Sequence, residues 1–189
     1  MLPILRGCRL TGLAAALLFS APLAAAEGSD VVGWVEKTRI LPWGVEVKAK
    51  LDSGALTSSM QAEHIEEFQR DGEDWVRFVV EVEDERTGEV VERTFEREVF
   101  RRLKVTGAGG VDRRQVVLMT ICLGDTRYEE QFSLEDRDDL IYPVLLGRRT
   151  LQSLGPLDVT ETFLRPPTCD EASPLRRHAD KVYDEDLGV

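Results

Sequence analysis

One short segment, Asp52-Ser53-Gly54, follows an alternating strand pattern and could present a carboxylate for chemistry. A carboxylate in a fixed position can act as a general base on a bound water, and a second carboxylate close by would share its proton. Gly54 allows a tight backbone path and Ser53 can hydrogen-bond locally, so the backbone would hold the acid in place. Because Asp-Ser-Gly is also common in ordinary turns, the tripeptide alone indicates no function.

A second segment, residues 142–155, contains an apolar run followed by a helical pattern. The run ends at Gly147, and the leucines beyond it, Leu151 and Leu154, fall on one face of a helix. We therefore predict a short helix over residues 148–153, ended by Gly155 and the proline that follows it.

Together the two motifs resemble those of the aspartic proteases of retroviral type, the retropepsins. Ala55 completes an apolar-Asp-Ser-Gly-Ala pattern, and Leu145-Leu146-Gly147-Arg148 gives the apolar-apolar-Gly-Arg pattern. Residues 31–164 are more closely similar to a bacterial family of retropepsin-like proteins that is often labelled ATP-dependent zinc proteases. The matching pieces keep their order along the chain: Val32-Gly33-Trp34, residues 48–55, Thr57-Ser58-Ser59, residues 75–78, residues 136–139 and residues 145–148.

This resemblance implies an all-β fold, a retropepsin-like closed barrel with a flap hairpin and one short C-terminal helix. It also implies that Asp52 is catalytic. Because the chain carries one Asp motif, a catalytic pair requires a homodimer in which Asp52 of each subunit meets its copy. By the same resemblance, Ser53 would brace the two Asp loops, Leu145 and Leu146 would pack under the loop, and Gly147 would allow a close approach.

One position departs from the family pattern. The bacterial family commonly has an arginine two residues after Gly54, and retroviral enzymes have an acid there that pairs with the arginine of the second motif. This chain has Leu56, so Arg148 has no such partner. The departure concerns substrate contacts and dimer bracing rather than Asp52.

The elements that must position these motifs are mainly strands. Apolar and alternating runs predict strands over residues 31–40, 45–51, 75–83, 89–96, 99–105, 115–123, 126–132 and 157–164. Long helical patterns are scarce, which also favours the all-β class. We predict a short helix or turn over residues 63–69.

A charged turn over residues 84–89 separates two of the predicted strands and indicates a long β-hairpin with Gly88 at its turn. In retropepsins a hairpin between the two motifs closes over the substrate, so Arg86, Thr87 and Gly88 are the flap candidates. The alternative is a surface hairpin without a gating role.

The first 26 residues have the composition of an export signal. Arg6 and Arg9 precede an apolar core, and Ala24-Ala25-Ala26 forms a small-residue cleavage site. We predict a signal peptide over residues 1–26, one retropepsin-like domain over 27–165, and a polar, mobile tail over 166–189. The mature protein would be periplasmic or secreted and not inserted in the membrane, with an uncleaved anchor as the lesser alternative.

The chain is acidic, with a net charge of −11. Removal of the signal would take away two of the 24 basic residues, leaving 22 against 35 acidic ones. This charge disfavours nucleic acids and anionic membranes as partners. It favours a basic or neutral polypeptide substrate.

Metal and cofactor chemistry has little support in the sequence. Only two histidines are present, His64 and His178, with no metal-binding motif around them, and residues 107–110 lack the lysine of a phosphate-binding loop. We therefore expect no metal and no cofactor. Export makes a disulfide between Cys122 and Cys169 possible, but the apolar run around Cys122 favours a free, buried thiol.

Three functions remain open from the sequence. The first is an exported aspartic endopeptidase that acts as a homodimer. The second is a catalytically inactive relative that binds peptides or regulates a partner, since some family members occur beside glutamate-ligase systems. The third, metal-dependent hydrolysis, ranks last.

Overall fold

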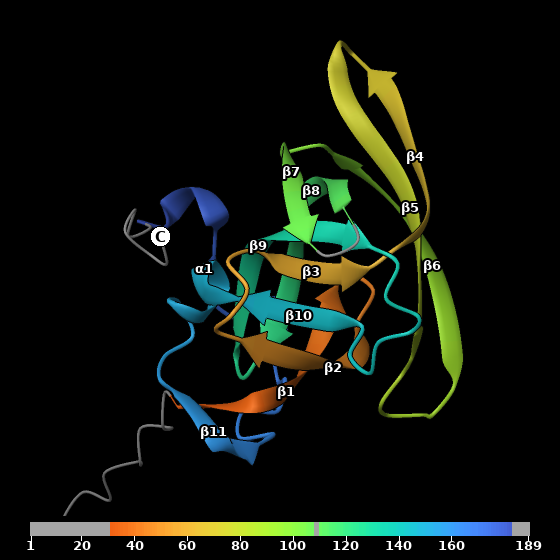
Figure 1. Ribbon diagram of the computed structural model, residues 1–189. Helices are drawn as coiled ribbons and strands as arrows, with labels where there is room; N and C mark the ends of the chain where they lie inside the picture. Colours follow the sequence, from red (N-terminus) through yellow and green to blue (C-terminus); the bar gives the residue numbers. More distant parts are fainter. Residues whose placement is uncertain (1–30, 108–109, 183–189) are drawn as a thin grey trace, which may run out of the picture.

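The computed structural model describes residues 31–107 and 110–182, and they form two β-sheets (Figure 1). The signal peptide predicted over residues 1–26 lies outside the described residues. Within these residues, no helix has the length and apolar character needed to cross a membrane.

The larger sheet closes into a six-stranded barrel, so the predicted all-β, retropepsin-like barrel is confirmed. Its strands, in order around the barrel, are β1 (Val32–Leu41), β2 (Val45–Asp52), β10 (Val144–Gly147), β3 (Ser58–Gln61), β9 (Thr126–Glu135) and β8 (Gly110–Leu123). Closure follows because β1 pairs with β2 along one edge and with β8 along the other.

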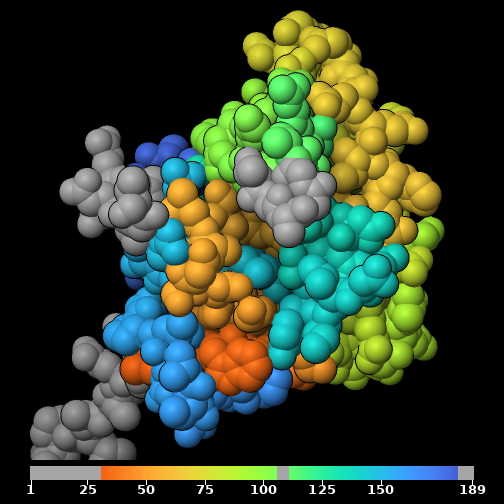
Figure 2. Space-filling view, viewed as in Figure 1, coloured from red at the N-terminus to blue at the C-terminus, as the bar shows by residue number. Residues whose placement is uncertain are grey.

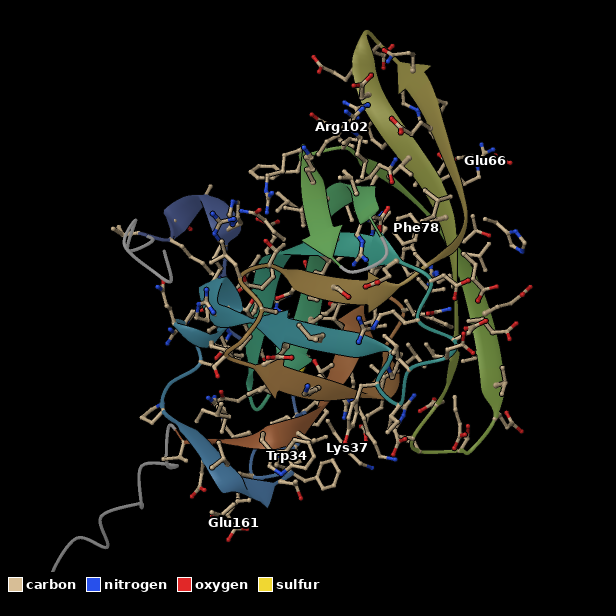
Figure 3. All side chains as sticks on the ribbon, in the orientation of Figure 1. Trp34, Lys37, Glu66, Phe78, Arg102 and Glu161 are labelled. Carbon is tan, nitrogen blue, oxygen red and sulfur yellow. A yellow bond between two sulfur atoms is a disulfide. The ribbon has the colours of Figure 1, made fainter. Side chains whose placement is uncertain are left out.

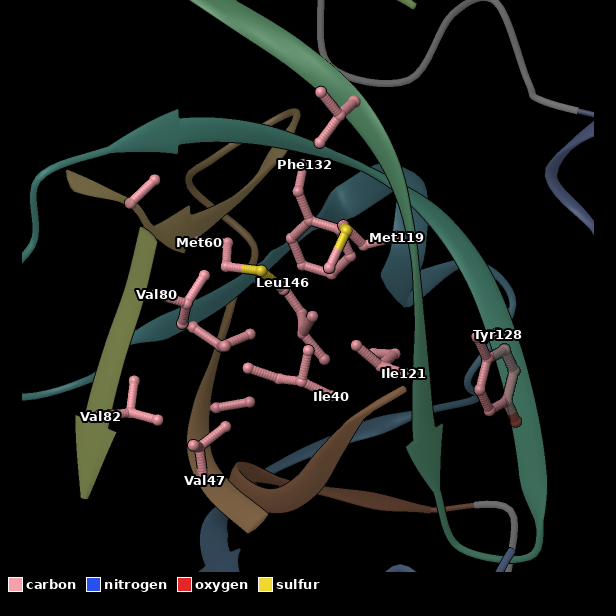
Figure 4. Close-up of a cluster of buried hydrophobic side chains, with 14 of the residues drawn as sticks. Ile40, Val47, Met60, Val80, Val82, Met119, Ile121, Tyr128, Phe132 and Leu146 are labelled. Atoms are coloured by element: carbon pink, nitrogen blue, oxygen red, sulfur yellow. The ribbon is translucent and has the colours of Figure 1, made fainter. Parts of the chain in front are cut away.

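Alternate residues of the barrel strands point inward and form one apolar core (Figure 4). Val47 and Leu51 of β2 are buried there, together with Met60 of β3, Phe132 of β9 and Leu146 of β10. Full burial of a side chain of this size contributes about 1.5–3 kcal/mol. The core therefore fixes the strand ends on which both motifs lie.

The second sheet has three strands, β4 (Glu63–Arg70), β5 (Glu73–Glu83) and β6 (Val90–Glu98). The helix or turn predicted over residues 63–69 is wrong, because this segment is β4. Ile65 and Phe68 have helical spacing, but the register of β4 on β5 shifts between Glu63 and Glu66. Such a bulge changes which residues share a face, so the spacing is compatible with a strand.

The β4–β5 hairpin projects beyond the barrel and is the yellow segment at the top of Figure 2. It is tied to β7 (Arg101–Gly107), the edge strand that pairs with β8. Arg102 of β7, labelled in Figure 3, lies beside this hairpin. It forms salt bridges with Glu67 of β4 at 2.6 Å and with Asp74 of β5 at 2.8 Å.

The remaining elements follow the second motif. The predicted helix is present as α1 (Arg148–Leu151), and β11 (Leu157–Thr162) pairs in parallel with β1. Two short elements lie further on, β12 (Leu175–Arg176) and the 3-10 helix η1 (His178–Asp180).

The C-terminal segment differs from the predicted mobile tail over residues 166–189. Its described part, residues 166–182, lies against the barrel, and β12 pairs with β9. A disulfide joins Cys122 to Cys169, with Cα atoms 5.9 Å apart. The expectation of a free Cys122 is therefore wrong: its strand is buried, as predicted, but the returning chain brings Cys169 beside it.

Candidate active site

Asp52 is the last residue of β2, and its side chain is held where the strand turns. The backbone N–H of Gly54 donates to Oδ1 at 2.8 Å, and Lys50 Nζ donates to Oδ2 at 3.1 Å. The Asp52 side chain is 26% exposed, so a ligand or a second subunit can reach it. Its burial alone would raise the pKa of Asp52, but the bonds from Lys50, Gly54 and Ala55 outweigh that effect and lower it below the ordinary value.

The second motif lies directly beside Asp52. Strand β10 is inserted between β2, to which it is parallel, and β3, to which it is antiparallel, and Gly147 pairs with Asp52. Leu146 is fully buried in the core, whereas Leu145, on the opposite side of the strand, is half-buried. The structure thus brings together both motifs, which lie far apart in the sequence.

Gly147 approaches the Asp loop, residues 53–57, so closely that a side chain would not fit. A Cβ at this position would lie 2.8 Å from the carbonyl carbon of Thr57 and 2.9 Å from that of Leu56. Both of these neighbours are backbone atoms, which cannot rotate away. The glycine is therefore required for packing β10 against the loop, as the resemblance implied.

A buried hydroxyl that sequence reasoning did not single out connects the loop to the second motif. Ser58 Oγ accepts the N–H of Gly147 at 3.0 Å and lies 2.8 Å from Thr150 Oγ1 of α1. The only signal for it was its place in the Thr57-Ser58-Ser59 match, which gave it no role.

Arg148 finds partners within its own chain despite the leucine at position 56. Its Nη1 donates to the carbonyl of Ser53 at 2.6 Å, and its backbone N–H donates to the carbonyl of Ala55 at 2.8 Å. The N–H of Arg149 adds a third bond, to the carbonyl of Leu56 at 3.2 Å. The start of α1 therefore supports the Asp loop through backbone carbonyls, a role that does not require an acid at position 56.

The flap candidates Arg86, Thr87 and Gly88 do not lie over this site. Their turn is attached to the start of β2, where the N–H of Glu85 donates to the carbonyl of Glu46 at 2.9 Å. Asp52 is at the other end of that strand. The structure thus corrects the expectation that the turn of the β5–β6 hairpin covers Asp52.

A different hairpin, β7–β8, begins beside the Asp loop. Arg101, the first residue of β7, donates from Nη2 to Thr57 Oγ1 at 3.0 Å. Gly107 pairs with Gly110 at the far end of this hairpin, and residues 108–109 lie outside the described chain. Arg101 was not identified from the sequence, since a lone arginine at the start of a strand forms no motif.

Basic side chains surround the Asp loop although the chain as a whole is acidic. Lys50, Arg101 and Arg148 contact the loop or Asp52, and Arg149 follows in α1. Burial lowers the pKa of Arg101, and the nearby charge of Arg149 lowers it further. The local potential at the site is therefore more positive than the net charge indicates.

A zinc site, as the label of the similar family implies, would require a cluster of metal-binding side chains. In the described part of the chain, no group of three or more histidine, cysteine, aspartate or glutamate residues is placed to hold a metal ion. Cys122 and Cys169 are bonded to each other, His64 is exposed on β4, and His178 packs edge-on against Phe100. These residues do not fit a zinc centre.

Comparison with known proteins adds family information to this geometry. Residues 31–168 match the family described as "RimB-like: Retropepsin-like aspartic endopeptidase RimB". A Shewanella halifaxensis protein named "Probable alpha-L-glutamate ligase" is 34% identical over 118 residues, which make up 62% of this chain and 25% of that protein. A Desulfotalea psychrophila protein of the same name is 36% identical over 107 residues, 56% of this chain and 22% of that protein. The chain thus spans about a quarter of the length of these relatives.

A solved structure is also similar. It is a Legionella pneumophila protein of unknown function that is 33% identical, with a TM-score of 0.60, and the match covers 70% of this chain and 95% of that one.

Proposed function

The chain belongs to the RimB-like family of retropepsin-like aspartic endopeptidases, and we propose that it is itself an aspartic endopeptidase that acts as a homodimer. The observation that carries the proposal is the position of Asp52, held by the Gly54 amide at the end of β2 with Gly147 opposite it on the inserted strand β10. Each chain supplies one such acid, so two chains are needed for a carboxylate pair.

The proposed chemistry uses the two Asp52 carboxylates as a unit. Like charges at close range disfavour double ionisation, so the pair holds one proton. The ionised carboxylate accepts a proton from a bound water, whose oxygen attacks the peptide carbonyl carbon. The protonated carboxyl donates to the carbonyl oxygen, and the tetrahedral intermediate then collapses with a proton passing to the leaving nitrogen. Ser53 is exposed beside Asp52 and would brace the two Asp loops across the dimer axis.

We assign the flap to the β7–β8 hairpin. Its first residue, Arg101, contacts Thr57 in the Asp loop, and β7 is the edge strand of its sheet. An edge strand has free backbone N–H and C=O groups, and an extended peptide can pair with them. This arrangement suits an endopeptidase that binds its polypeptide substrate in an extended conformation.

The basic residues around the site favour a substrate with acidic side chains. Lys50, Arg101, Arg148 and Arg149 would attract such a chain, whereas net charge alone had favoured a basic or neutral one. Relatives named as glutamate ligases contain a region similar to this domain, which agrees with an acidic polypeptide as the substrate class.

Export to the periplasm is proposed from the predicted signal peptide and supported by the disulfide between Cys122 and Cys169, because such bonds persist in oxidising compartments. The intact mass of the protein recovered from the periplasm should correspond to a chain that starts near Glu27. A full-length species confined to the cytoplasm would contradict export.

A catalytically inactive peptide-binding module is the alternative, and Asp52→Asn distinguishes the two. The substitution keeps size and most hydrogen bonding but removes the shared-proton pair, so cleavage of an unstructured acidic polypeptide should be lost while the fold persists. Glu92→Gln, an exposed carboxylate-to-amide change on β6, is the matched control and should cleave normally.

Sedimentation of the same proteins measures whether they form dimers. In the cleavage assay, the specific activity of the wild type should rise with protein concentration as dimers form. A strictly monomeric wild type that cleaves peptide, or a fully active Asp52→Asn variant, would refute the mechanism. Peptide binding without cleavage by the wild type would favour the inactive module.

A further inference from the structure

The C-terminal segment, residues 166–182, is bound to the barrel at several points along its length, and we call it the strap. The disulfide holds it at Cys169, and the N–H of Arg127 donates to the carbonyl of Pro174 at 2.8 Å. Farther along, Lys181 Nζ bonds the buried carboxylate of Glu130. In Figure 1 the blue end of the strap lies near α1, on the side of the barrel where β2 ends.

One side chain of the strap, His178, contacts the start of the β7–β8 hairpin. Its ring meets the ring of Phe100 edge-on, with centroids 5.0 Å apart. Its Nε2 lies 3.2 Å from Nε2 of Gln131, and its backbone N–H donates to Glu129 Oε1 at 3.1 Å. The His178 ring is half-buried, and the Gln131 side chain belongs to the buried polar residues of the barrel.

Gln131 connects this histidine to the Asp loop. Its Oε1 accepts a hydrogen bond from Arg101 Nε at 2.7 Å, and the other arm of the same guanidinium reaches Thr57 Oγ1 at 3.0 Å. Because the amide oxygen is used by Arg101, the amide nitrogen of Gln131 faces His178 and must donate to it. The bond therefore needs a neutral His178 whose Nε2 accepts.

We propose that His178 is a positioning residue: through Gln131 it holds the Arg101 guanidinium against Thr57 and so fixes the base of the β7–β8 hairpin relative to the Asp loop. The disulfide between Cys122 and Cys169 secures the strap that carries it. The catalytic consequence rests on the proposed endopeptidase function, but the structural coupling does not. Reduction of the disulfide would thus loosen the active site, and the enzyme would reach full activity only in an oxidising compartment.

The alternative is that the strap only covers the barrel and adds global stability. The two interpretations predict that different residues respond to a local substitution in the strap. Loss of one hydrogen-bonded contact at His178 should loosen Thr57 and Arg101 in particular if the side chains are coupled, whereas mere packing predicts a change at the strap alone.

The first experiment measures amide hydrogen exchange in the full chain for wild type, His178→Ala and Arg176→Ala. Arg176 is the matched control, since it lies two residues away in the strap, donates to the carbonyl of Ser153, and does not touch Gln131. We expect His178→Ala to raise exchange about five- to tenfold around Thr57 and Arg101, and Arg176→Ala to leave these amides unchanged. Unchanged exchange there in His178→Ala would overturn the proposal, as would an equal effect from Arg176→Ala.

The second experiment follows cleavage kinetics of an acidic peptide. His178→Ala should lower kcat/KM about five- to tenfold, and His178→Gln, which keeps an acceptor for Gln131, should recover part of it, whereas His178→Phe, which keeps only the ring contact, should not. Recovery by His178→Phe but not by His178→Gln would overturn the hydrogen-bonded connection. If the wild type cleaves nothing while His178→Ala still loosens Thr57 and Arg101, the endopeptidase function fails and the coupling stands.

Reduction tests the role of the disulfide. Dithiothreitol should raise exchange at Thr57 and Arg101 in the wild type, and it should change nothing further in a Cys122→Ala/Cys169→Ala variant. A reduced wild type that exchanges faster only within residues 166–182 would separate the strap from the site and contradict the proposal.

Discussion

The substitution Gly147→Ala tests the packing of the second motif against the Asp loop. The added Cβ would lie 2.8 Å from the Thr57 carbonyl carbon and 2.9 Å from the carbonyl carbon and oxygen of Leu56. Ordinary carbon contacts begin near 3.5 Å, so the loop or β10 must move by more than half an ångström. Overpacking of this kind costs about 1–3 kcal/mol.

Such a movement would also disturb the bonds that α1 gives to the loop. The N–H of Arg148 lies 2.8 Å from the carbonyl of Ala55, and that of Arg149 lies 3.2 Å from the carbonyl of Leu56. With a urea dependence of about 2 kcal/mol per molar, a loss of about 2 kcal/mol lowers the unfolding midpoint by about 1 M. Cleavage should fall further than stability, because the displaced loop carries Asp52.

The matched control is Gly54→Ala, where an added Cβ meets only a side-chain atom, Asp52 Oδ1, at 3.0 Å. Its unfolding midpoint should therefore fall less than that of Gly147→Ala. The two variants are compared in stability only, because Gly54 donates to Asp52 and its substitution would also affect cleavage. An unchanged midpoint in Gly147→Ala, or an equal loss in both variants, would refute the packing argument.

Two further predictions concern the disulfide and the acid pair. Reduction of the bond between Cys122 and Cys169 should lower the free energy of unfolding by about 4 kcal/mol, since the bond closes a loop with a sequence separation of 47; equal denaturation midpoints with and without reductant would contradict this. The homodimer should tighten as the pH falls from neutral toward the lowered pKa of Asp52, because the paired acids bind a proton that the separate subunits do not; sedimentation at several pH values measures this, and a dissociation constant independent of pH would argue against a carboxylate pair.

The all-β class was predictable from local strand patterns, whereas the barrel and the meeting of the two motifs were predicted from the resemblance to retropepsins. The alternation from Val45 to Leu51 predicted β2, whereas the packing of Leu145 and Leu146 beside the Asp loop was implied by the resemblance. The short strand β3 was not predicted, since Ser58–Gln61 is a four-residue, largely polar segment whose burial depends on β9 and β10. Tertiary contacts decide such elements.

The flap and the strap show where local patterns mislead. The turn around Gly88 has residues typical of a hairpin turn. A backbone hydrogen bond attaches it to the start of β2, however, and so places it away from Asp52. The proline-rich, charged composition after Pro166 predicted a mobile tail, yet Cys169 and the pairing of β12 with β9 hold the described part on the barrel. Neither long-range contact leaves a periodic signal in the sequence.

The electrostatics of Asp52 give a physical reason for linking catalysis to assembly. In a single subunit the Lys50 ammonium and the Gly54 amide stabilise the ionised carboxylate, which suits a general base but not an acid. Two unit charges 4 Å apart repel by roughly 4 kcal/mol at an effective dielectric constant of about 20. A repulsion of that size raises the pKa of one member of the pair, so it gains the proton that the mechanism requires. The acid in the proposed reaction would therefore be created by dimerisation, and a lone subunit with the same side chains would have only the base.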